Sequence, residues 1–260
     1  MTTKISHCDN PSNNKNFSSF GRHQLQREII LNLPNNAITI EDLGSGRFTY
    51  VRNSQNTKIK KIIQVSQKTS HIELVPVLPI HVPSYKTDFF FLRFQDPAII
   101  TENSTFETQI AFPIEIGLFL VDQGKVSGFD FFSCESMGPY FGLYGTPENG
   151  RLCKYAISSL EENHLDLQQF LHAQFKIKIT NELDKPTSVG KIVFPITDHD
   201  LYYNCNNVVM DGLYATIKNR VGLHVIETVQ NPMKNNANWS LASRDTEKTD
   251  YKFSMDRGFD

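Results

Sequence analysis

The stretch YGTPENGR, which begins at Tyr144, holds the residues whose types and spacing come nearest to a known chemistry. Gly145 and Gly150 enclose four residues, as the glycines of a phosphate-binding loop do. That loop continues with Lys, which contacts phosphate, and then with Ser or Thr, which binds magnesium, whereas Arg151 and a leucine follow here. Glu148 would bring a negative charge to the phosphates, and the following RLCKYAIS alternates like a strand instead of opening a helix. The sequence therefore argues against nucleotide binding.

The same stretch has the composition of a tight turn between two strands. Thr146 and Pro147 suit the start of a helix, because Thr caps helices and Pro is tolerated at the first helical position. Asn149 and Gly150 would end such a helix at once. In a turn, Pro147 fixes φ while Asn149 and Gly150 accept positive φ, so we expect a β-hairpin.

A second candidate site is TDHDLYY, in which Asp198, His199 and Asp200 offer oxygen and imidazole ligands for a divalent metal. Consecutive residues of a strand point to opposite faces, so only Asp198 and Asp200 would converge. Asp is also frequent in the surface turns that follow strands. We favour the turn, keep Asp198 and Asp200 as weak metal candidates, and expect no cofactor.

Signatures of hydrolases and of nucleic-acid binding are weak. No G-x-S-x-G nucleophile elbow occurs, and Cys153 is interpreted as a buried strand residue. The four cysteines include no C-x-x-C pair and are interpreted as reduced thiols. The run DFFFLRF with Lys58, Lys60 and Lys61 has the composition of a base-stacking platform, but a net charge of -2 gives no supporting field. We expect these rings in the core, no nucleic-acid partner, and an interaction protein rather than an enzyme.

The elements that must position these residues read in period two over most of the chain. AITIEDLGSGRFTYV is predicted to form a hairpin, and strands are predicted in KIKKIIQVS, HIELVPVL, DFFFLRF, TFETQIAFPIEIGLFLV, AQFKIKITNEL, SVGKIVFPI, NVVMDGLYATIK and GLHVIETVQ. Pro76, Pro79 and Pro83 make VPVLPIHVPSY an edge or crossing segment, because each proline removes a ladder donor. SSLEENHLDLQQFLHA is either a short helix or an irregular loop. The chain is therefore predicted to be all-β with at most one short helix.

The polar terminal segments and one repeated tripeptide indicate the domain organisation. IAFPIEI at Ile110–Ile116 and IVFPITD at Ile192–Asp198 both end a strand in Phe-Pro-Ile, which either two equivalent sandwiches or chance would explain. We expect two packed antiparallel β-sandwiches of immunoglobulin-like architecture. The expected segments are a disordered N-terminal segment at 1–20, an N-terminal sandwich at 21–132, a C-terminal sandwich at 133–230 and a polar tail at 231–260.

LYGTPENGRLCKY, with FPIEIGLFLVD upstream and KIVFPITDHDLYY downstream, resembles the archaeal family called domain of unknown function 432. The resemblance runs from about Glu28 to Val229 and centres on the signature Y-G-T-P-E-x-G. It implies a cytoplasmic all-β protein without an assigned chemistry. Through family genes that lie near mechanosensitive channel genes, it also implies a membrane-associated partner. The polar termini depart from the family pattern.

A loop signature matters because loops tolerate change unless something outside the fold, or an unusual backbone, requires them. Glu148 and Arg151 either form an ion pair that holds the hairpin together or present both charges to a partner. The expected contact residues are Tyr144, Gly145, Thr146, Pro147, Glu148, Gly150 and Arg151.

Two hypotheses of function follow. The first is a non-enzymatic interaction or structural module that meets an unidentified protein partner through this hairpin, aided by exposed strand edges. The alternative is a protein that acts on a small ligand or carbohydrate, with its site between the two domains. No apolar run is long enough for a signal peptide or a spanning helix, so we expect a cytoplasmic protein without direct membrane insertion.

Overall fold

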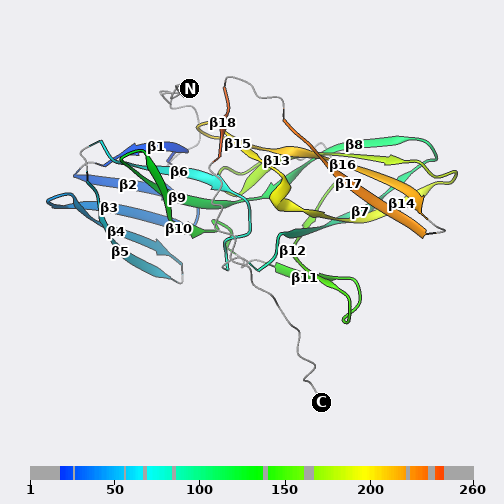
Figure 1. Cartoon of the computed structure of the whole chain (residues 1–260), viewed down its shortest axis with the longest axis horizontal. Helices are drawn as coiled ribbons and strands as arrows, with labels where there is room; N and C mark the ends of the chain where they lie inside the picture. The colour runs from blue at the N-terminus through cyan, green and yellow to red at the C-terminus, as the bar shows by residue number, and fades with distance from the viewer. Residues whose placement is uncertain are drawn as a thin grey trace, which may run out of the picture.

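The computed structural model describes residues 18–25, 27–55, 57–66, 69–83, 86–136, 140–160, 167–220, 223–233 and 238–242. Over these residues the protein consists of β-strands, connecting loops and the 3-10 turn η2 (Ile196–Asp198), and they include no α-helix, so the all-β prediction is confirmed. The strands form two sandwiches that lie side by side along the longest axis (Figure 1). In this part of the chain no helix has the length and hydropathy that a membrane crossing requires.

The first sandwich packs a sheet of order β2-β3-β4-β5 against a sheet of order β1-β6-β9-β10. Burial follows period two, so that Ile38 and Ile40 of β3 are buried while Ala37 is exposed. The rings of Tyr50 and Phe129, from opposite sheets, lie 5.3 Å apart. The strands are β1 (Gly21–Gln24), β2 (Glu28–Leu33), β3 (Asn36–Gly44), β4 (Arg47–Ser54), β5 (Lys58–Gln64), β6 (His71–Val77), β9 (Glu115–Asp122) and β10 (Lys125–Phe132).

The second sandwich packs a sheet of order β11-β12-β7-β14 against one of order β18-β15-β16-β13-β8, with β17 beside β16. Its core is aromatic: Phe90 meets Phe112 at 4.5 Å, and Phe175 meets Phe194 at 5.7 Å, each pair joining the two sheets. The strands are β7 (Phe89–Ile100), β8 (Thr105–Pro113), β11 (Tyr140–Tyr144), β12 (Arg151–Ser158), β13 (His172–Asn181), β14 (Thr187–Pro195), β15 (Leu201–Tyr203), β16 (Val208–Arg220), β17 (Leu223–Asn231) and β18 (Ser240–Leu241).

The sheets do not follow the predicted boundary between residues 132 and 133. Strands β7 and β8 precede that boundary, yet β7 pairs with β12 and β14, and β8 pairs with β13. Strands β9 and β10 then return to the first sandwich. Period-two patterning shows which face of a strand is buried but not which sheet the strand joins, so the pattern alone did not show this exchange.

Among the described strands, the sheets are antiparallel except at two places. The pairs β12 with β7 and β13 with β16 are parallel. Parallel neighbours require a long crossover, which the intervening strands supply. The repeated Phe-Pro-Ile tripeptide does not mark equivalent strands of two sandwiches. Phe112 and Phe194 lie in opposite sheets of the same sandwich, with their ring centroids 6.3 Å apart.

Two features predicted from short sequence patterns are present in the structure. Ser45 and Gly46 form the predicted hairpin turn, with φ of 57° and 72°. Strand β6 includes Pro76, but β1 pairs with β6 only as far as Leu74, so at Pro76 the strand has β9 as its partner and is an edge on the other side. The predicted short helix falls partly on residues 161–166, outside the described residues; the flanking described residues form loop and turn leading into β13.

A continuous hydrophobic core joins the two sandwiches. The chain crosses between them after β6, at Ile114 between β8 and β9, and after β10. Phe20, next to β1, packs against Phe170 at 4.5 Å and Tyr203 at 5.9 Å, both from the second sandwich. The main cluster of buried apolar side chains extends through both sandwiches. The junction is therefore packed, and the crossing segments converge there.

Candidate functional site

The hairpin predicted around Gly145 is present. Strands β11 and β12 pair from Tyr140 with Tyr155 to Tyr144 with Arg151, and the loop that joins them projects from the second sandwich (Figure 1). Within the described residues β11 pairs with β12 alone, which makes β11 an edge strand. An edge strand of this kind leaves one row of backbone hydrogen-bonding groups without a strand partner.

The turn differs from the prediction in the residue that takes positive φ. That residue is Gly145, with φ of 116°, and not Asn149 or Gly150. The N–H of Asn149 donates to the Thr146 carbonyl oxygen at 3.2 Å, so Pro147 occupies the second position of a β-turn, where its fixed φ is suitable. Gly150 is needed for space instead, because a Cβ there would lie 2.5 Å from the Thr146 carbonyl oxygen.

The two charged residues of the hairpin lie apart from each other. Among the ion pairs of the described residues, none joins Glu148 to Arg151. Arg151 lies over the ring of Phe89 instead, with its guanidinium carbon 3.9 Å from the ring centroid. Glu148 is exposed in the turn. The ion pair that would hold the hairpin together is therefore absent here, and a cation–π contact orients Arg151.

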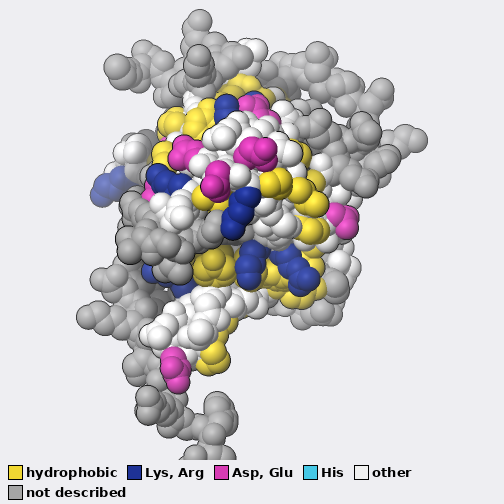
Figure 2. All heavy atoms as spheres, turned by 90° about the vertical axis from the view of Figure 1, so that its right-hand side faces the viewer, with side chains coloured by type: hydrophobic (Ala, Val, Ile, Leu, Met, Phe, Trp, Pro, Cys, Tyr) yellow, Lys and Arg dark blue, Asp and Glu magenta, His cyan; other side chains and the backbone are white. Residues whose placement is uncertain are grey.

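Aromatic rings and cations share the solvent-facing side of the sheet β11-β12-β7-β14, which we call the outer face. The ring of Phe91 lies 5.7 Å from that of Tyr144 and 5.2 Å from that of Tyr155. Lys191 Nζ lies 5.8 Å from the Tyr144 ring centroid. Figure 2 shows Lys and Arg side chains beside hydrophobic ones at this end of the molecule. The outer face carries Phe89, Phe91, Arg93, Tyr144, Arg151, Tyr155 and Lys191.

Three cations of the outer face have no carboxylate partner within the described residues. Arg93, Arg151 and Lys191 are exposed and enter none of the ion pairs there. Arg93 on β7 lies directly opposite Lys191 on β14. Like charges directly opposite each other destabilise a sheet, so an anion bound at the outer face would reduce this repulsion.

The opposite side of the hairpin is apolar. Leu143 and Leu152 face each other across β11 and β12, on the side of the sheet that elsewhere covers the core. Their side chains are nevertheless 42% and 38% exposed, because the hairpin extends beyond the sandwich. The projecting hairpin therefore has an apolar side and an aromatic, basic side.

The structure places the weak metal candidates Asp198 and Asp200 on either side of a buried histidine. Asp198 is exposed and Asp200 is partly exposed, while the side chain of His199 between them is buried. His199 packs edge-on against Phe194 at 5.2 Å, and burial lowers its pKa, which keeps the imidazole neutral. In the part of the chain that is described, no group of three or more His, Cys, Asp and Glu residues is placed to hold a metal ion.

Other predicted features also separate in space. A base-stacking platform would combine the aromatic run on β7 with three lysines, Lys58, Lys60 and Lys61. These lysines lie on β5 of the first sandwich, whereas β7 belongs to the second sandwich, so the two groups do not share one surface. Cys134 and Cys153 are free and buried, and burial raises their thiol pKa values to about 12 and about 11. The prediction of four reduced thiols is corrected at Cys205, which is disulfide-bonded.

A cavity of about 370 Å³ lies where the crossing segments meet. Glu115 and Lys154 are both buried beside it, and their Oε1 and Nζ atoms are 2.8 Å apart. The other Glu115 oxygen accepts from the N–H groups of His81 at 2.7 Å and Val82 at 3.1 Å. The wall residues are Pro79, Phe90, Pro113, Ile114, Glu115, Ser133, Glu135, Tyr140, Lys154, Tyr155, Ala156 and Ile157. The alternative hypothesis, a protein that acts on a small ligand or carbohydrate between its two domains, requires a cavity in such a position.

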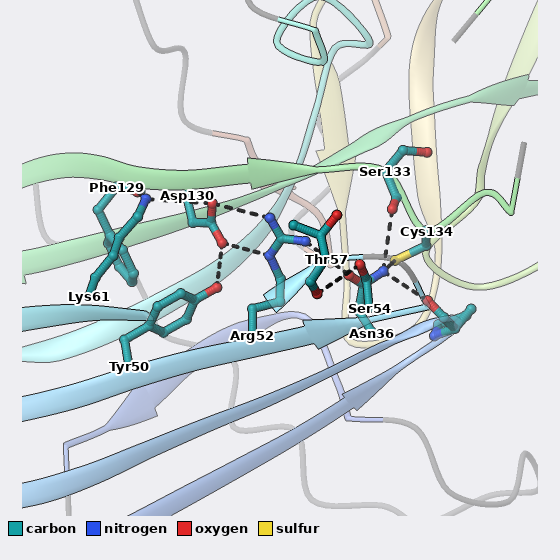
Figure 3. Close-up of polar contacts among 11 residues, drawn as sticks. Asn36, Tyr50, Arg52, Ser54, Thr57, Lys61, Phe129, Asp130, Ser133 and Cys134 are labelled. Carbon is teal, nitrogen blue, oxygen red and sulfur yellow. Dashed lines mark hydrogen bonds and ion pairs between the residues drawn. The ribbon is translucent and has the colours of Figure 1, made fainter. Parts of the chain in front are cut away.

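A buried polar network, shown in Figure 3, extends through the first sandwich to Ser133, which is one of the residues that line the cavity. Asp130 accepts from Tyr50 Oη at 2.5 Å and from Arg52 Nε at 2.7 Å, which connects the two sheets of the first sandwich. Arg52 in turn donates to Asn36 Oδ1 at 3.2 Å, and the Asn36 amide donates to the Ser133 carbonyl at 3.3 Å. The network therefore fixes the segment after β10 that brings Ser133 and its neighbours to the cavity.

Sequence reasoning did not identify the cavity residues. A signal for two of them is nonetheless present, since Glu115 interrupts the apolar run FPIEIGLF and Lys154 interrupts RLCKYAIS. An isolated charge in an otherwise apolar strand has to find a partner when it is buried. Glu135 lies in a loop with no such pattern, so only the packing of the crossing segments reveals it.

Comparison with known proteins supports the family resemblance that the hairpin signature indicated. No curated protein and no solved structure matches the chain. One family model does match, over residues 19–256, and therefore over nearly the whole chain. The chain belongs to the family described as protein of unknown function (DUF432).

Proposed function

We propose that the protein is a non-enzymatic interaction module that binds an extended, acidic segment of a partner protein through the hairpin β11–β12. The observation that carries this proposal is the group of cations on the outer face, Arg93, Arg151 and Lys191, with no carboxylate partner in the described residues. Acidic side chains of a partner would accept hydrogen bonds from Arg151 on the hairpin, and those that extend across the outer face would relieve the repulsion between Arg93 and Lys191.

The edge strand β11 supports an added strand as the mode of binding. Exposed sheet edges accept extended peptides, whose main chain supplies affinity while alternate side chains supply specificity. Side chains of the added strand would point alternately to the two sides of the hairpin. One set would meet Leu143, and the other would meet Tyr144 and Arg151. The partner segment is therefore expected to alternate apolar and acidic residues.

Peptide display tests this proposal on the full-length protein. The immobilised chain is offered a random library of nine-residue peptides, and we expect enrichment of sequences that alternate apolar residues with Asp or Glu. The double variant Arg151→Glu, Lys191→Glu should shift the enriched residues at the acidic positions to Lys and Arg, because the backbone edge remains while the charge beside it is reversed.

Two further variants sharpen the test. Leu143→Lys places a charge on the apolar side of the edge strand and should reduce enrichment, since such charges block strand addition. Lys58→Glu changes an exposed lysine on β5 of the first sandwich and should leave the preference unchanged. Enrichment without an acidic pattern, or the same acidic pattern in the double variant, would contradict the proposal.

A further inference from the structure

Unlike the cations of the outer face, the buried residues Glu115 and Lys154 of the junction cavity have partners for their charges. Both oxygens of Glu115 are occupied, by Lys154 on one side and by two backbone N–H groups on the other. Lys154 also donates to the carbonyl oxygen of Val82. These two buried charges thus satisfy each other, as buried charges must. Neither leaves a net charge for a ligand.

Glu135 is the exception among the charged residues of the cavity. Its side chain is half-buried, and in the described part of the chain its carboxylate enters no hydrogen bond or ion pair. Burial raises the pKa of this carboxyl, Lys154 lowers it and Glu115 raises it. With Glu115 and Lys154 neutralising each other, the ionised site carries one uncompensated negative charge beside apolar walls.

Much of the remaining wall is apolar. Pro79, Pro113 and Ile114 line the cavity beside Glu135, whereas Tyr140 and Tyr155, which also border it, belong to the outer face of the sheet, where the Tyr155 ring packs against Phe91. A carboxylate without a cationic partner beside apolar walls favours a ligand that carries a positive charge and an apolar portion. A volume of about 370 Å³ suits a small molecule.

We infer that this cavity binds a small organic cation, with an ammonium group against Glu135 and an apolar portion against the apolar walls. A neutral saccharide lacks the positive charge that would pair with the Glu135 carboxylate. An anion would be repelled by Glu135. The inference concerns a different surface from the proposed function and does not depend on it.

Titration of the full-length protein with n-hexylamine, followed by NMR, tests this inference. The probes for comparison are n-hexanol, which has the same chain without the charge, hexanoate, which reverses the charge, and glucose. We expect saturable binding of hexylamine at least about tenfold tighter than that of hexanol, since a hydrogen bond to a charged group contributes about 1.5–3 kcal/mol. Shifted resonances should include Ile114 and Ala156 of the wall.

Glu135→Gln retains the shape of the side chain and should remove the preference for hexylamine over hexanol. Glu102→Gln is the matched control, because Glu102 is exposed in the turn between β7 and β8 and should leave the preference intact. Equal binding of hexylamine and hexanol to the unaltered protein, a preference that survives in Glu135→Gln, or tighter binding of glucose or hexanoate would each overturn the inference. The comparison on the unaltered protein decides the matter even if the variant fails to fold.

Discussion

Gly150 shows how a single residue shapes the hairpin. A Cβ at this position would lie 2.5 Å from the Thr146 carbonyl oxygen and 2.6 Å from Leu143 Cγ. We expect Gly150→Ala to loosen the hairpin and to raise amide hydrogen exchange in β11 and β12 about tenfold, because overpacking costs about 1–3 kcal/mol. Gly190→Ala is the control, since its Cβ would meet its nearest neighbour at an ordinary 3.5 Å. Equal exchange in the two variants would contradict this account.

Glu135 is expected to lower stability at neutral pH. Burial raises its pKa in the folded state, with Lys154 acting against this rise and Glu115 adding to it. A raised folded-state pKa means that the protonated carboxyl is favoured, so the penalty is absent below the ordinary pKa of about 4.3 and develops as pH rises through the folded-state value. Glu135→Gln should therefore raise the melting temperature at pH 7 and leave it nearly unchanged at pH 3. An equal shift at both pH values, measured by calorimetry, would show a different cause.

Asp130 is expected to stabilise the first sandwich through its buried contacts with Arg52 and Tyr50. Asp130→Ala would leave Arg52 buried without its carboxylate and Tyr50 without its acceptor. We expect the free energy of unfolding in urea to fall by about 3–5 kcal/mol, the usual effect of removing one partner of a buried pair. Glu107→Ala removes an exposed carboxylate that pairs with two lysines and should change stability far less. A loss in Asp130→Ala no larger than in the control would refute a structural role for the network.

At the scale of elements, the cation pair on the outer face links stability to binding. Lys191→Glu would place an acidic residue opposite Arg93 and convert a like-charge pair into an opposite-charge pair. We expect a gain of about 0.2–1 kcal/mol in the free energy of unfolding, together with weaker binding of the acidic peptides selected by display. Urea denaturation and a peptide titration measure the two effects. A variant that loses stability would show that the repulsion is already relieved by other charges.

The strands themselves were largely predictable, because a half-buried strand repeats every two residues and leaves that period in the sequence. Ile38 and Ile40 against Ala37 is one example, and the turn at Ser45 and Gly46 is another. Their pairing was not predictable. Whether β8 joins β13 depends on contacts between residues far apart in the chain, such as Phe112 with Phe175, and no local pattern contains them.

The residues of the candidate site were likewise predictable only where a local sequence pattern identifies them. The hairpin residues were identified because glycine, proline and asparagine define a turn through their own backbone preferences. The cation group was missed because Arg93, Arg151 and Lys191 come from three strands that meet only in the folded sheet. The cavity was missed for a related reason, since Glu115, Glu135 and Lys154 lie on separate segments that converge where the chain crosses between sandwiches.

For the whole molecule, the exchange of strands predicts that neither half of the chain folds alone. A fragment of residues 21–132 contains β7 and β8 without β12, β13 and β14, so Phe90 and Phe112 would lose the aromatic core that they share with Phe175 and Phe194. The complementary fragment 133–230 lacks the two strands that its sheets require. Both fragments should give poorly dispersed NMR spectra, whereas the full chain should unfold in one calorimetric transition because its core is continuous. A well-dispersed spectrum from either fragment, or two separate transitions in the full chain, would show that the sandwiches are independent and that residues 132 and 133 mark a true domain boundary.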